Sequence, residues 1–359
     1  MSKTSKKPKS DKTKVSYYPS VSIADPKFKR KLVKRFRADG LAVITDVFSS
    51  KQCKKYMDRI VDHFVSLGTG IDPANIADTW TVHNLPPQTR HGLFQALTSN
   101  FDTVWDIRSS PSVRKIFRTV YSDLRAKPVD DFIVSGDGIN VRPGFIGPFT
   151  KPSTRDWAHV DQTVRDDIFK CVQGQAVLTN TTAAFRATPK SHLAYDRILT
   201  KLGIDSKSNW LKFSPTDLLT VQKIVGKYTD KWQIPIYAPK GSFIIWASTT
   251  IHSAKLQDHI EKPLRSDPYN GWRGVVYVCY RPTEEFTNGQ IKKRINAFES
   301  NRTTNHWGTK IFSKRPGIRF LYAEKRHPLI ERMLDDPTYV YKKIGKPELG
   351  VEHEYLLGL

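Results

Sequence analysis

The amino-acid sequence predicts an α+β protein with a mainly β core, and three observations support this prediction. Up to residue 129, apolar residues recur at helical spacing. From residue 130 to about residue 282, short β-branched and aromatic runs alternate with turns rich in Gly, Pro, Asn and Asp. Many short strands at this spacing are typical of a sandwich or a barrel. After residue 282 the chain is basic and again more helical in pattern.

The first expected helix lies in "DPKFKRKLVKRFRADG". Phe28, Leu32 and Phe36 follow one another at intervals of four and form an apolar stripe on a basic helix. This helix should end at Gly40, because glycine after the last apolar residue is a common stop signal. The run "LAVITDVF" follows and predicts a short buried strand.

A second amphipathic helix is expected after Ser49 or Ser50, either of which is a suitable N-cap. Its inward side chains would be Cys53, Met57, Ile60, Val61 and Phe64. Residues 92–124 are expected to be helical in two pieces, with a break near Pro111. In the last part of the chain, "HPLIERMLDD" is the clearest helical segment.

The charge of the chain is strongly basic, with 58 Lys and Arg against 35 Asp and Glu and a formal net charge of +23. Such an excess favours polyanions such as nucleic acid, an anionic membrane or a phosphorylated substrate. A surface that simply keeps the protein in solution explains it equally well. Six lysines fall in the first fourteen residues, which predicts a disordered tail. That tail is also compatible with nuclear localisation or nucleic-acid binding.

The cysteines and the hydropathy bear on the compartment. Three cysteines, Cys53, Cys171 and Cys279, lie far apart and are odd in number, which argues against a disulfide scaffold or a Cys-rich zinc site. No apolar run approaches eighteen residues, and no apolar segment follows the lysine-rich start. We therefore expect an intracellular, cytoplasmic protein without a transmembrane helix, with the nucleus as the alternative.

The stretch "TRDWAHVDQTVRDD" contains a candidate metal-binding pair. If residues 157–163 are extended, His159 and Asp161 point to the same face of the strand. An imidazole nitrogen and a carboxylate oxygen could then hold one metal ion. A second histidine would complete the facial triad of non-haem Fe(II) oxygenases, which leaves coordination positions open. The alternative is a polar pair on a surface strand, and "HIE" at His259–Glu261 is a rival of the same kind.

A second stretch, "APKGSFIIWASTTIHSAKLQ", supplies the missing histidine. It predicts a turn at Gly241, an apolar strand over Ser242–Trp246 and then His252. Further on, "GWRGVVYVCYRP" predicts another strand with Arg273 at its start. A guanidinium group binds a carboxylate through two parallel hydrogen bonds, which suits a dicarboxylate co-substrate beside iron.

Together these stretches resemble the phytanoyl-CoA dioxygenase-like branch of the Fe(II)/2-oxoglutarate-dependent oxygenases. Five pieces occur in the order of that family between Lys27 and Pro282: "FRADGLAVITDVFSSKQC", "WAHVDQT", "VQGQAVLTNTTAAFRATPKSH", "GSFIIWASTTIHSA" and "WRGVVYVCYRP". Each piece alone is a weak signal, and it is their order and spacing that are specific. The resemblance implies a double-stranded β-helix, or jelly roll, flanked by N-terminal helices and a C-terminal extension.

The resemblance also implies the site. His159, Asp161 and His252 would be the iron ligands, and Arg273 would bind the distal carboxylate of 2-oxoglutarate. The family usually places this arginine nearer to the second histidine, and "LQDHIEKPLRSDPYN" looks like an insertion. Arg265 is therefore the second candidate. Lys255 is a poorer third, because a lysine offers a single point charge.

Other polar residues are weaker candidates for the pocket. Asn140, together with Arg142 in "GINVRPG", and Gln173, together with Gln175 in "VQGQ", could contact 2-oxoglutarate or the substrate. Each pair is equally compatible with an ordinary polar strand face. Two departures from the family pattern stand out. "WAST" at residues 246–249 replaces "WDSR", and a lysine at position 190 replaces a glycine, so the turn there need not require a positive φ.

The expected organisation is a basic tail at residues 1–25, an oxygenase-like domain at 26–282 and a basic extension packed on the core at 283–359. Within the domain, residues 26–129 would be the helical part and 130–282 the jelly-roll core. The function expected from the resemblance is hydroxylation of an organic substrate with Fe(II), O2 and 2-oxoglutarate, releasing succinate and CO2. The substrate would be a small molecule, an acyl group or a side chain.

Two other functions remain open from the sequence. One is an oxygenase fold that acts on or binds nucleic acid, since aromatic and basic residues alternate in "NRTTNHWGTKIFSKRPGIRFLYAEKRH". The other is a jelly roll that only binds or supports a partner. The presence of all three candidate ligands argues against this last reading. Neither the substrate nor the oligomeric state follows from the sequence.

Overall fold

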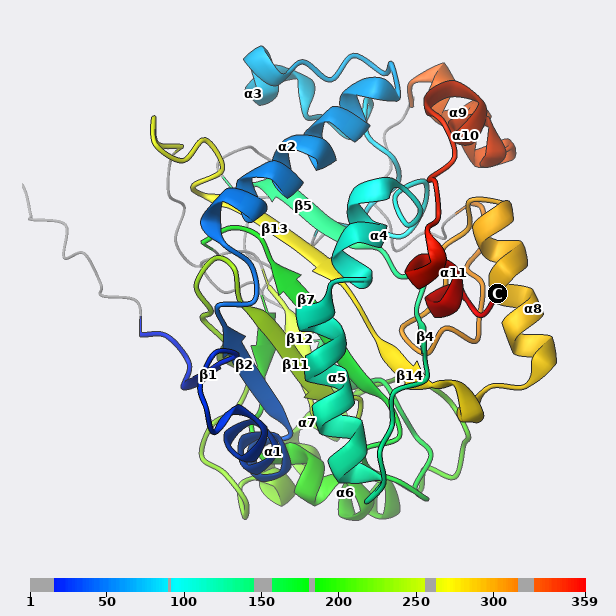
Figure 1. Ribbon diagram of the computed structural model, residues 1–359. Helices are drawn as coiled ribbons and strands as arrows, with labels where there is room; N and C mark the ends of the chain where they lie inside the picture. The colour runs from blue at the N-terminus through cyan, green and yellow to red at the C-terminus, as the bar shows by residue number, and fades with distance from the viewer. Residues whose placement is uncertain (1–15, 90–91, 145–156, 181–184, 256–262, 316–325) are drawn as a thin grey trace, which may run out of the picture.

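The computed structural model describes residues 16–89, 92–144, 157–180, 185–255, 263–315 and 326–359 (Figure 1). Its largest sheet has seven strands, and every neighbouring pair is antiparallel except β1 with β2. Their order in the sheet is β1 (Ser20–Ser22), β2 (Leu41–Thr45), β11 (Phe243–Ala247), β7 (Val172–Val177), β13 (Trp272–Tyr277), β5 (Ile139–Pro143) and β3 (Leu93–Phe94).

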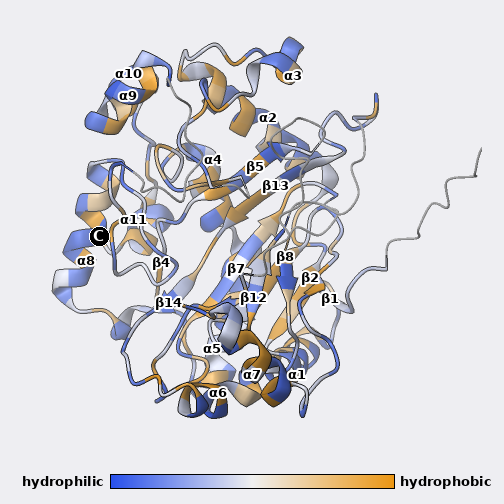
Figure 2. Ribbon diagram, turned by 180° about the vertical axis from the view of Figure 1, so that it is seen from behind, coloured by the Kyte–Doolittle hydropathy of each residue, from blue (hydrophilic) through white to orange (hydrophobic). Residues whose placement is uncertain are grey.

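A second, five-stranded antiparallel sheet lies against the first. Its order is β10 (Ile234–Pro235), β8 (Phe185–Ala187), β12 (His252–Ala254), β6 (His159–Val160) and β9 (Leu211–Lys212). Figures 1 and 2 show β12 beside β7 from opposite sides of the molecule. A short pair, β14 (Tyr280–Pro282) with β4 (Phe132–Val134), completes the strands. This is an α+β, jelly-roll-like arrangement of two facing sheets.

Helices cover the outer face of the seven-stranded sheet and continue around it (Figure 1). Those nearest this face are α1 (Phe28–Asp39), α2 (Ser50–Ser66), α4 (Asp102–Arg108) and α5 (Pro111–Leu124). The others are α3 (Ile76–Thr79), α6 (Tyr195–Lys201), α7 (Pro215–Val225), α8 (Asn288–Glu299), α9 (Pro328–Asp335), α10 (Thr338–Ile344) and α11 (Val351–Leu357). None of the helices in the described ranges is both long and apolar enough to cross a membrane.

The large sheet is apolar on both faces, because successive strand residues point in opposite directions. Ile44 and Val276 point outward into the core cluster that includes the apolar residues of α1, α2, α4 and α5. Val43 and Val275 point inward and pack with Phe185 of the smaller sheet. The space between the two sheets is therefore a second interior, and the side chains that face it are the candidates for a site.

Several local predictions are confirmed. Phe28, Leu32 and Phe36 are buried in α1, and Gly40 ends that helix in the left-handed conformation at φ 71°. Ser49 caps α2 in a reciprocal capping box. The expected break at Pro111 is the boundary between α4 and α5. The predicted helix in "HPLIERMLDD" is α9.

Two local predictions are wrong. Residues 92–101 are not helical: Leu93 and Phe94 form β3, because they pair with β5 at the edge of the sheet. The turn at Lys190 does need a positive φ, since this lysine sits at φ 68°. Its N–H donates to the Asp39 carbonyl at 2.8 Å, so tertiary contacts hold a conformation that an L-residue seldom adopts.

Gly138, just before β5, is a position where any side chain is expected to damage the fold. A Cβ there would lie 1.9 Å from the carbonyl oxygen of Phe94, which is backbone and cannot rotate away. We expect Gly138→Ala to lower the free energy of unfolding by about 1–3 kcal/mol, as overpacking does. Gly289→Ala in α8 is the control, because the nearest atom is 4.0 Å away. It should raise stability by about 0.5–1 kcal/mol. Urea denaturation of both variants tests this, and an equally stable Gly138→Ala protein would contradict it.

Candidate metal centre

Two neighbouring strands of the smaller sheet bring the candidate ligands together. His159 in β6 and His252 in β12 are directly opposite each other in the antiparallel register, and their ring centroids are 4.2 Å apart. Asp161 follows β6, where its backbone N–H donates to the Ser248 carbonyl at 2.8 Å. One ligand atom from each of the three residues lies within 4.8 Å of the others. All three side chains are buried.

The two imidazole rings are oriented by the backbone. His159 donates from Nδ1 to the Trp157 carbonyl at 3.2 Å, and His252 donates from Nδ1 to the Thr250 carbonyl at 2.8 Å. A carbonyl oxygen can only accept, so Nδ1 carries the proton in both neutral rings. Each Nε2 is then left with a lone pair and faces Asp161. This second-shell pattern is common in metal-binding histidines.

The distances within the group call for a cation. His252 Nε2 lies 3.2 Å from Asp161 Oδ2, and His159 Nε2 lies 3.8 Å from Asp161 Oδ1. A neutral imidazole Nε2 and a carboxylate oxygen are both acceptors, so their close approach requires a proton or a metal ion between them. Two imidazoles and one carboxylate form the donor set of a facial triad. The residues therefore fit a divalent metal such as Fe(II).

The electrostatics favour the deprotonated, metal-binding forms. Burial, followed by the neighbouring His252, lowers the pKa of His159 to about 3, so this ring is neutral at neutral pH. Burial alone would raise the pKa of Asp161, but the surrounding histidines, His159 first, hold it well below its ordinary value. The site thus presents a carboxylate and a neutral imidazole without first having to release protons.

The predicted Gln173 contacts a candidate ligand. It comes from β7 of the large sheet and donates from Nε2 to Asp161 Oδ2 at 2.8 Å. The sequence indicated a role in cofactor binding, whereas in the structure this amide orients the carboxylate. Gln175, on the same face of β7, is also buried.

Of the arginines that the sequence left open, Arg273 is the one inside. It lies in β13 on the inner face, with 1% of its surface exposed, while Arg265 lies in an exposed turn. Arg273 donates from Nη2 to the Tyr277 hydroxyl at 3.5 Å. Its Nε has no hydrogen-bond partner among the described residues. A buried guanidinium with an unsatisfied N–H fits an anionic ligand such as the distal carboxylate of 2-oxoglutarate.

A second buried arginine faces Arg273 from β5. Arg142 is its direct cross-strand neighbour. Burial first, and then the charge of Arg273, lowers the pKa of Arg142 to about 9. Asn140 is buried two residues before it on the same strand. Lys255 is half-buried, and the rival "HIE" pattern at residues 259–261 lies outside the described residues.

Aromatic rings surround the histidines. Trp157 stacks on His159 with ring centroids 4.6 Å apart and planes 15° apart. Trp246 of β11 lies 5.6 Å from the ring of His252. Trp210, 6.3 Å from His159, is 47% exposed and lies on the solvent side. These rings limit the access of water to the histidines, which strengthens electrostatic interactions in the site.

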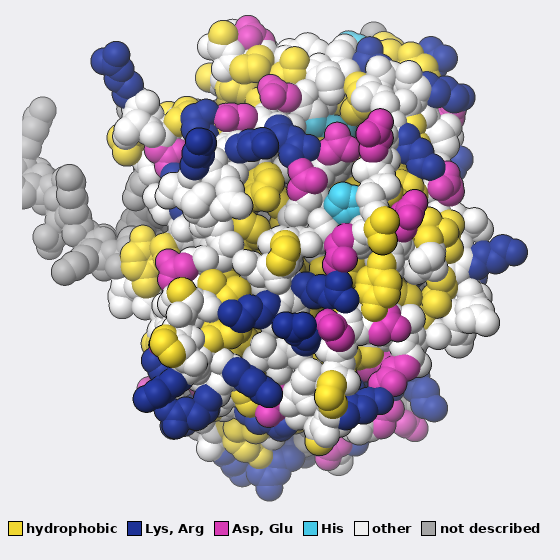
Figure 3. Space-filling model, in the orientation of Figure 1, with side chains coloured by type: hydrophobic (Ala, Val, Ile, Leu, Met, Phe, Trp, Pro, Cys, Tyr) yellow, Lys and Arg dark blue, Asp and Glu magenta, His cyan; other side chains and the backbone are white. Residues whose placement is uncertain are grey.

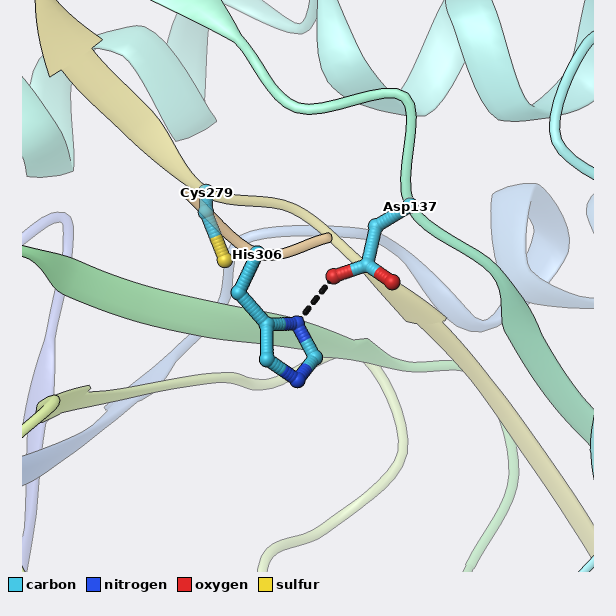
Figure 4. A group of neighbouring side chains, drawn as sticks. All are labelled: Asp137, Cys279 and His306. Carbon is cyan, nitrogen blue, oxygen red and sulfur yellow. Dashed lines mark hydrogen bonds and ion pairs between the residues drawn. The ribbon is translucent and has the colours of Figure 1, made fainter. Parts of the chain in front are cut away.

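Sequence reasoning missed one residue at the centre, His306. It follows α8 in the C-terminal part and forms a group with Asp137 and Cys279 (Figure 4). Its Nδ1 is hydrogen-bonded to Asp137 Oδ2, and its Nε2 lies 3.8 Å from Asp161 Oδ2. Burial alone would lower the pKa of His306, but the Asp137 carboxylate raises it well above its ordinary value. No motif in the sequence marked this histidine.

The comparisons with known proteins address the fold. No protein-family model matches the chain. One curated relative, Ava biosynthesis cluster protein O of Aspergillus versicolor, is 24% identical over 144 residues. That match covers 39% of this chain and 42% of the relative, so less than half of the relative's length is matched.

Two solved structures resemble most of the chain. The hypothetical protein JW0805 from Escherichia coli, solved at high pH, is 14% identical with a TM-score of 0.58, covering 96% of this chain and 85% of that one. GlcNAc Inducible Gene 2, GIG2 (DUF1479), from Candida albicans is 13% identical with a TM-score of 0.54, covering 93% and 80%. At these identities the likeness shows a shared fold, and it does not single out the phytanoyl-CoA dioxygenase-like family.

Proposed function

We propose that the chain is a non-haem Fe(II)- and 2-oxoglutarate-dependent dioxygenase with a double-stranded β-helix core. The observation that supports this best is the buried group of His159, Asp161 and His252 on one sheet. The inner face of the other sheet supplies the buried Arg273. A divalent metal site and an anion-binding guanidinium within one interior are the two requirements of this chemistry.

Each residue has a defined role in the proposal. His159, Asp161 and His252 hold the metal, and Gln173 orients the Asp161 carboxylate. Arg273 binds the distal carboxylate of 2-oxoglutarate, with Arg142 and Asn140 beside it on β5. When bound, Fe(II) with 2-oxoglutarate and O2 supplies the oxidising power that hydroxylates a C–H bond, with release of succinate and CO2. The protein contributes the ligands, the orientation of the co-substrate and a site with limited access to water.

The proposed substrate is a small organic molecule or an acyl-type compound. The curated relative belongs by name to a biosynthesis cluster, which supports a small-molecule substrate. The basic surface offers less support for nucleic acid, because cations and acids are mixed on it (Figure 3). Arg37 pairs with Asp123 at 2.6 Å and Lys127 with Glu284 at 2.9 Å, for example. Trp307, within the aromatic and basic segment once considered for base stacking, is buried.

The direct test is an anaerobic titration of the purified protein with Fe(II) and then 2-oxoglutarate, followed by visible absorption. We expect a charge-transfer band that needs both components and disappears in His159→Ala. No band in the intact protein, together with no binding of 2-oxoglutarate by calorimetry, would contradict the proposal and favour a jelly roll that only binds a partner.

A further inference from the structure

The segment that follows α8 is fastened to the back of the metal centre. Thr304 donates from its N–H to the Gly136 carbonyl at 2.7 Å, and its hydroxyl accepts from the Gly136 N–H at 2.8 Å. Asn305 accepts through Oδ1 from the backbone N–H groups of Thr309 and Lys310, both at 3.1 Å. These bonds fix the backbone on either side of His306 and Trp307. The positions of these two side chains are therefore determined by the fold.

His306 and Trp307 reach the same residue from this segment. His306 places Nε2 3.8 Å from Asp161 Oδ2, while Trp307 donates from Nε1 to the Asp161 carbonyl at 2.8 Å. Arg281 lies over the Trp307 ring, 4.9 Å from its centroid, and keeps the indole in place. Two consecutive residues thus contact the carboxylate and the backbone of one candidate ligand.

The other side of the His306 ring is anchored in the core. Its Nδ1 donates to Asp137, whose side chain is fully buried (Figure 4). Asp137 is itself held on two sides. Its Oδ1 accepts from the Gly138 N–H at 2.7 Å, and its carbonyl accepts from Arg108 Nη2 at 2.7 Å. The ring therefore cannot turn away from Asp161 without breaking a buried, charge-assisted hydrogen bond.

We propose that His306 is a positioning residue that, with Trp307, holds Asp161 in its metal-binding orientation; this inference rests on the proposed function. Asp161 is then held from both sides, by Gln173 of the large sheet and by His306 of the C-terminal segment. Partners of this kind fix the orientation of a metal-binding carboxylate, and losing one typically weakens metal binding about 10–100-fold. The C-terminal segment is thereby part of the site.

A second metal ion held by Asp137, Cys279 and His306 is the main rival explanation. Their ligand atoms lie within 4.8 Å of one another, and thiol, imidazole and carboxylate are zinc ligands. The hydrogen bonds argue against it, because the proton on His306 Nδ1 and the Gly138 N–H already occupy the Asp137 carboxylate. In addition, burial raises the pKa of the Cys279 thiol, which keeps it protonated.

The test uses Co(II) as the probe, titrated anaerobically into the full chain and followed by visible absorption. His306→Phe keeps a ring but loses both nitrogens, so we expect Co(II) to bind about 10–100-fold more weakly. His306→Gln can place an amide nitrogen near the original Nε2 and should recover most of the affinity. His306→Asn can only mimic Nδ1 and should not. Trp307→Phe removes the second contact and should weaken binding further in combination with His306→Phe.

A matched control is His353→Phe in α11. This half-buried histidine bonds to the Ser109 hydroxyl at 2.9 Å, and no contact with the triad is recorded for it among the described residues. It should leave Co(II) affinity and spectrum unchanged. Circular dichroism and thermal melting establish that each variant is folded. If His306→Phe does not fold, the comparison of Gln with Asn at the same position still decides the question.

The outcomes separate the alternatives. Equal Co(II) affinity and equal spectra in the wild type and His306→Phe, or in the Gln and Asn variants, would overturn the positioning role. A second Co(II) equivalent with a thiolate charge-transfer band, lost in Cys279→Ser but not in Cys171→Ser, would overturn it in favour of a second metal site. A wild type that binds no Co(II) would sink both this inference and the proposed function. Co(II) bound at the triad with no binding of 2-oxoglutarate would defeat the proposed function alone, and the His306 variants would still report on Asp161.

Discussion

Replacing Asp161 with alanine is expected to abolish stoichiometric Fe(II) binding. Asp161 is the one carboxylate among the three candidate ligands and contributes the negative charge that balances the metal. Its removal should cost more than the about 10–100-fold typical of losing a residue that only supports a ligand. Anaerobic calorimetry with Fe(II) measures the loss directly. The variant should also be less stable by about 1–3 kcal/mol, because the buried Gln173 amide loses its acceptor.

Asp166→Ala is the matched control for Asp161→Ala. Asp166 lies five residues later, is largely exposed and pairs with Lys170 at 2.6 Å. Its removal should leave Fe(II) affinity unchanged and alter stability by less than about 0.5 kcal/mol, as for most surface substitutions. Wild-type Fe(II) affinity in a folded Asp161→Ala protein would refute the assignment of this carboxylate as a ligand.

Replacing Arg273 with methionine is expected to weaken 2-oxoglutarate binding by about 100-fold, which corresponds to about 3 kcal/mol. Methionine preserves much of the buried apolar stem and removes the guanidinium that would pair with the distal carboxylate. Fe(II) affinity should stay within about threefold, because Arg273 lies on the other sheet from the three ligands and supports none of them. Calorimetric titration of the metal-loaded protein with 2-oxoglutarate gives both numbers.

Arg265→Met distinguishes the two arginines left open by the sequence. Arg265 is exposed in the structure, so its removal should change 2-oxoglutarate affinity by less than about twofold. Arg273→Lys should be intermediate, because an ammonium is a single point charge without the planar fork. A larger loss in the Arg265 variant than in the Arg273 variant would reverse the assignment.

Much of the site could be anticipated because its chemistry depends on local patterns. His159 and Asp161 are two residues apart, and an extended chain places such residues on one face whatever surrounds it. Arg273 begins a long apolar strand, which made burial of its side chain a reasonable expectation. Gln173 was also identified from its strand, but the sequence suggested a cofactor contact. Its actual partner is Asp161, since the register between sheets decides which side chains face each other.

The sequence by itself determined the composition of the layers, the spacing of the ligands and the boundaries of most helices. Those properties follow from short-range periodicity, capping and turn residues, which act within a few positions of the chain. Only the tertiary structure decided that His252 pairs opposite His159, that Arg142 faces Arg273 and that His306 reaches Asp161. These contacts join residues about 90–150 positions apart or in separate strands, and they depend on how the two sheets and the C-terminal segment pack. Lys190 illustrates the same limit, because packing against Asp39 imposes a backbone conformation that a lysine would not adopt alone.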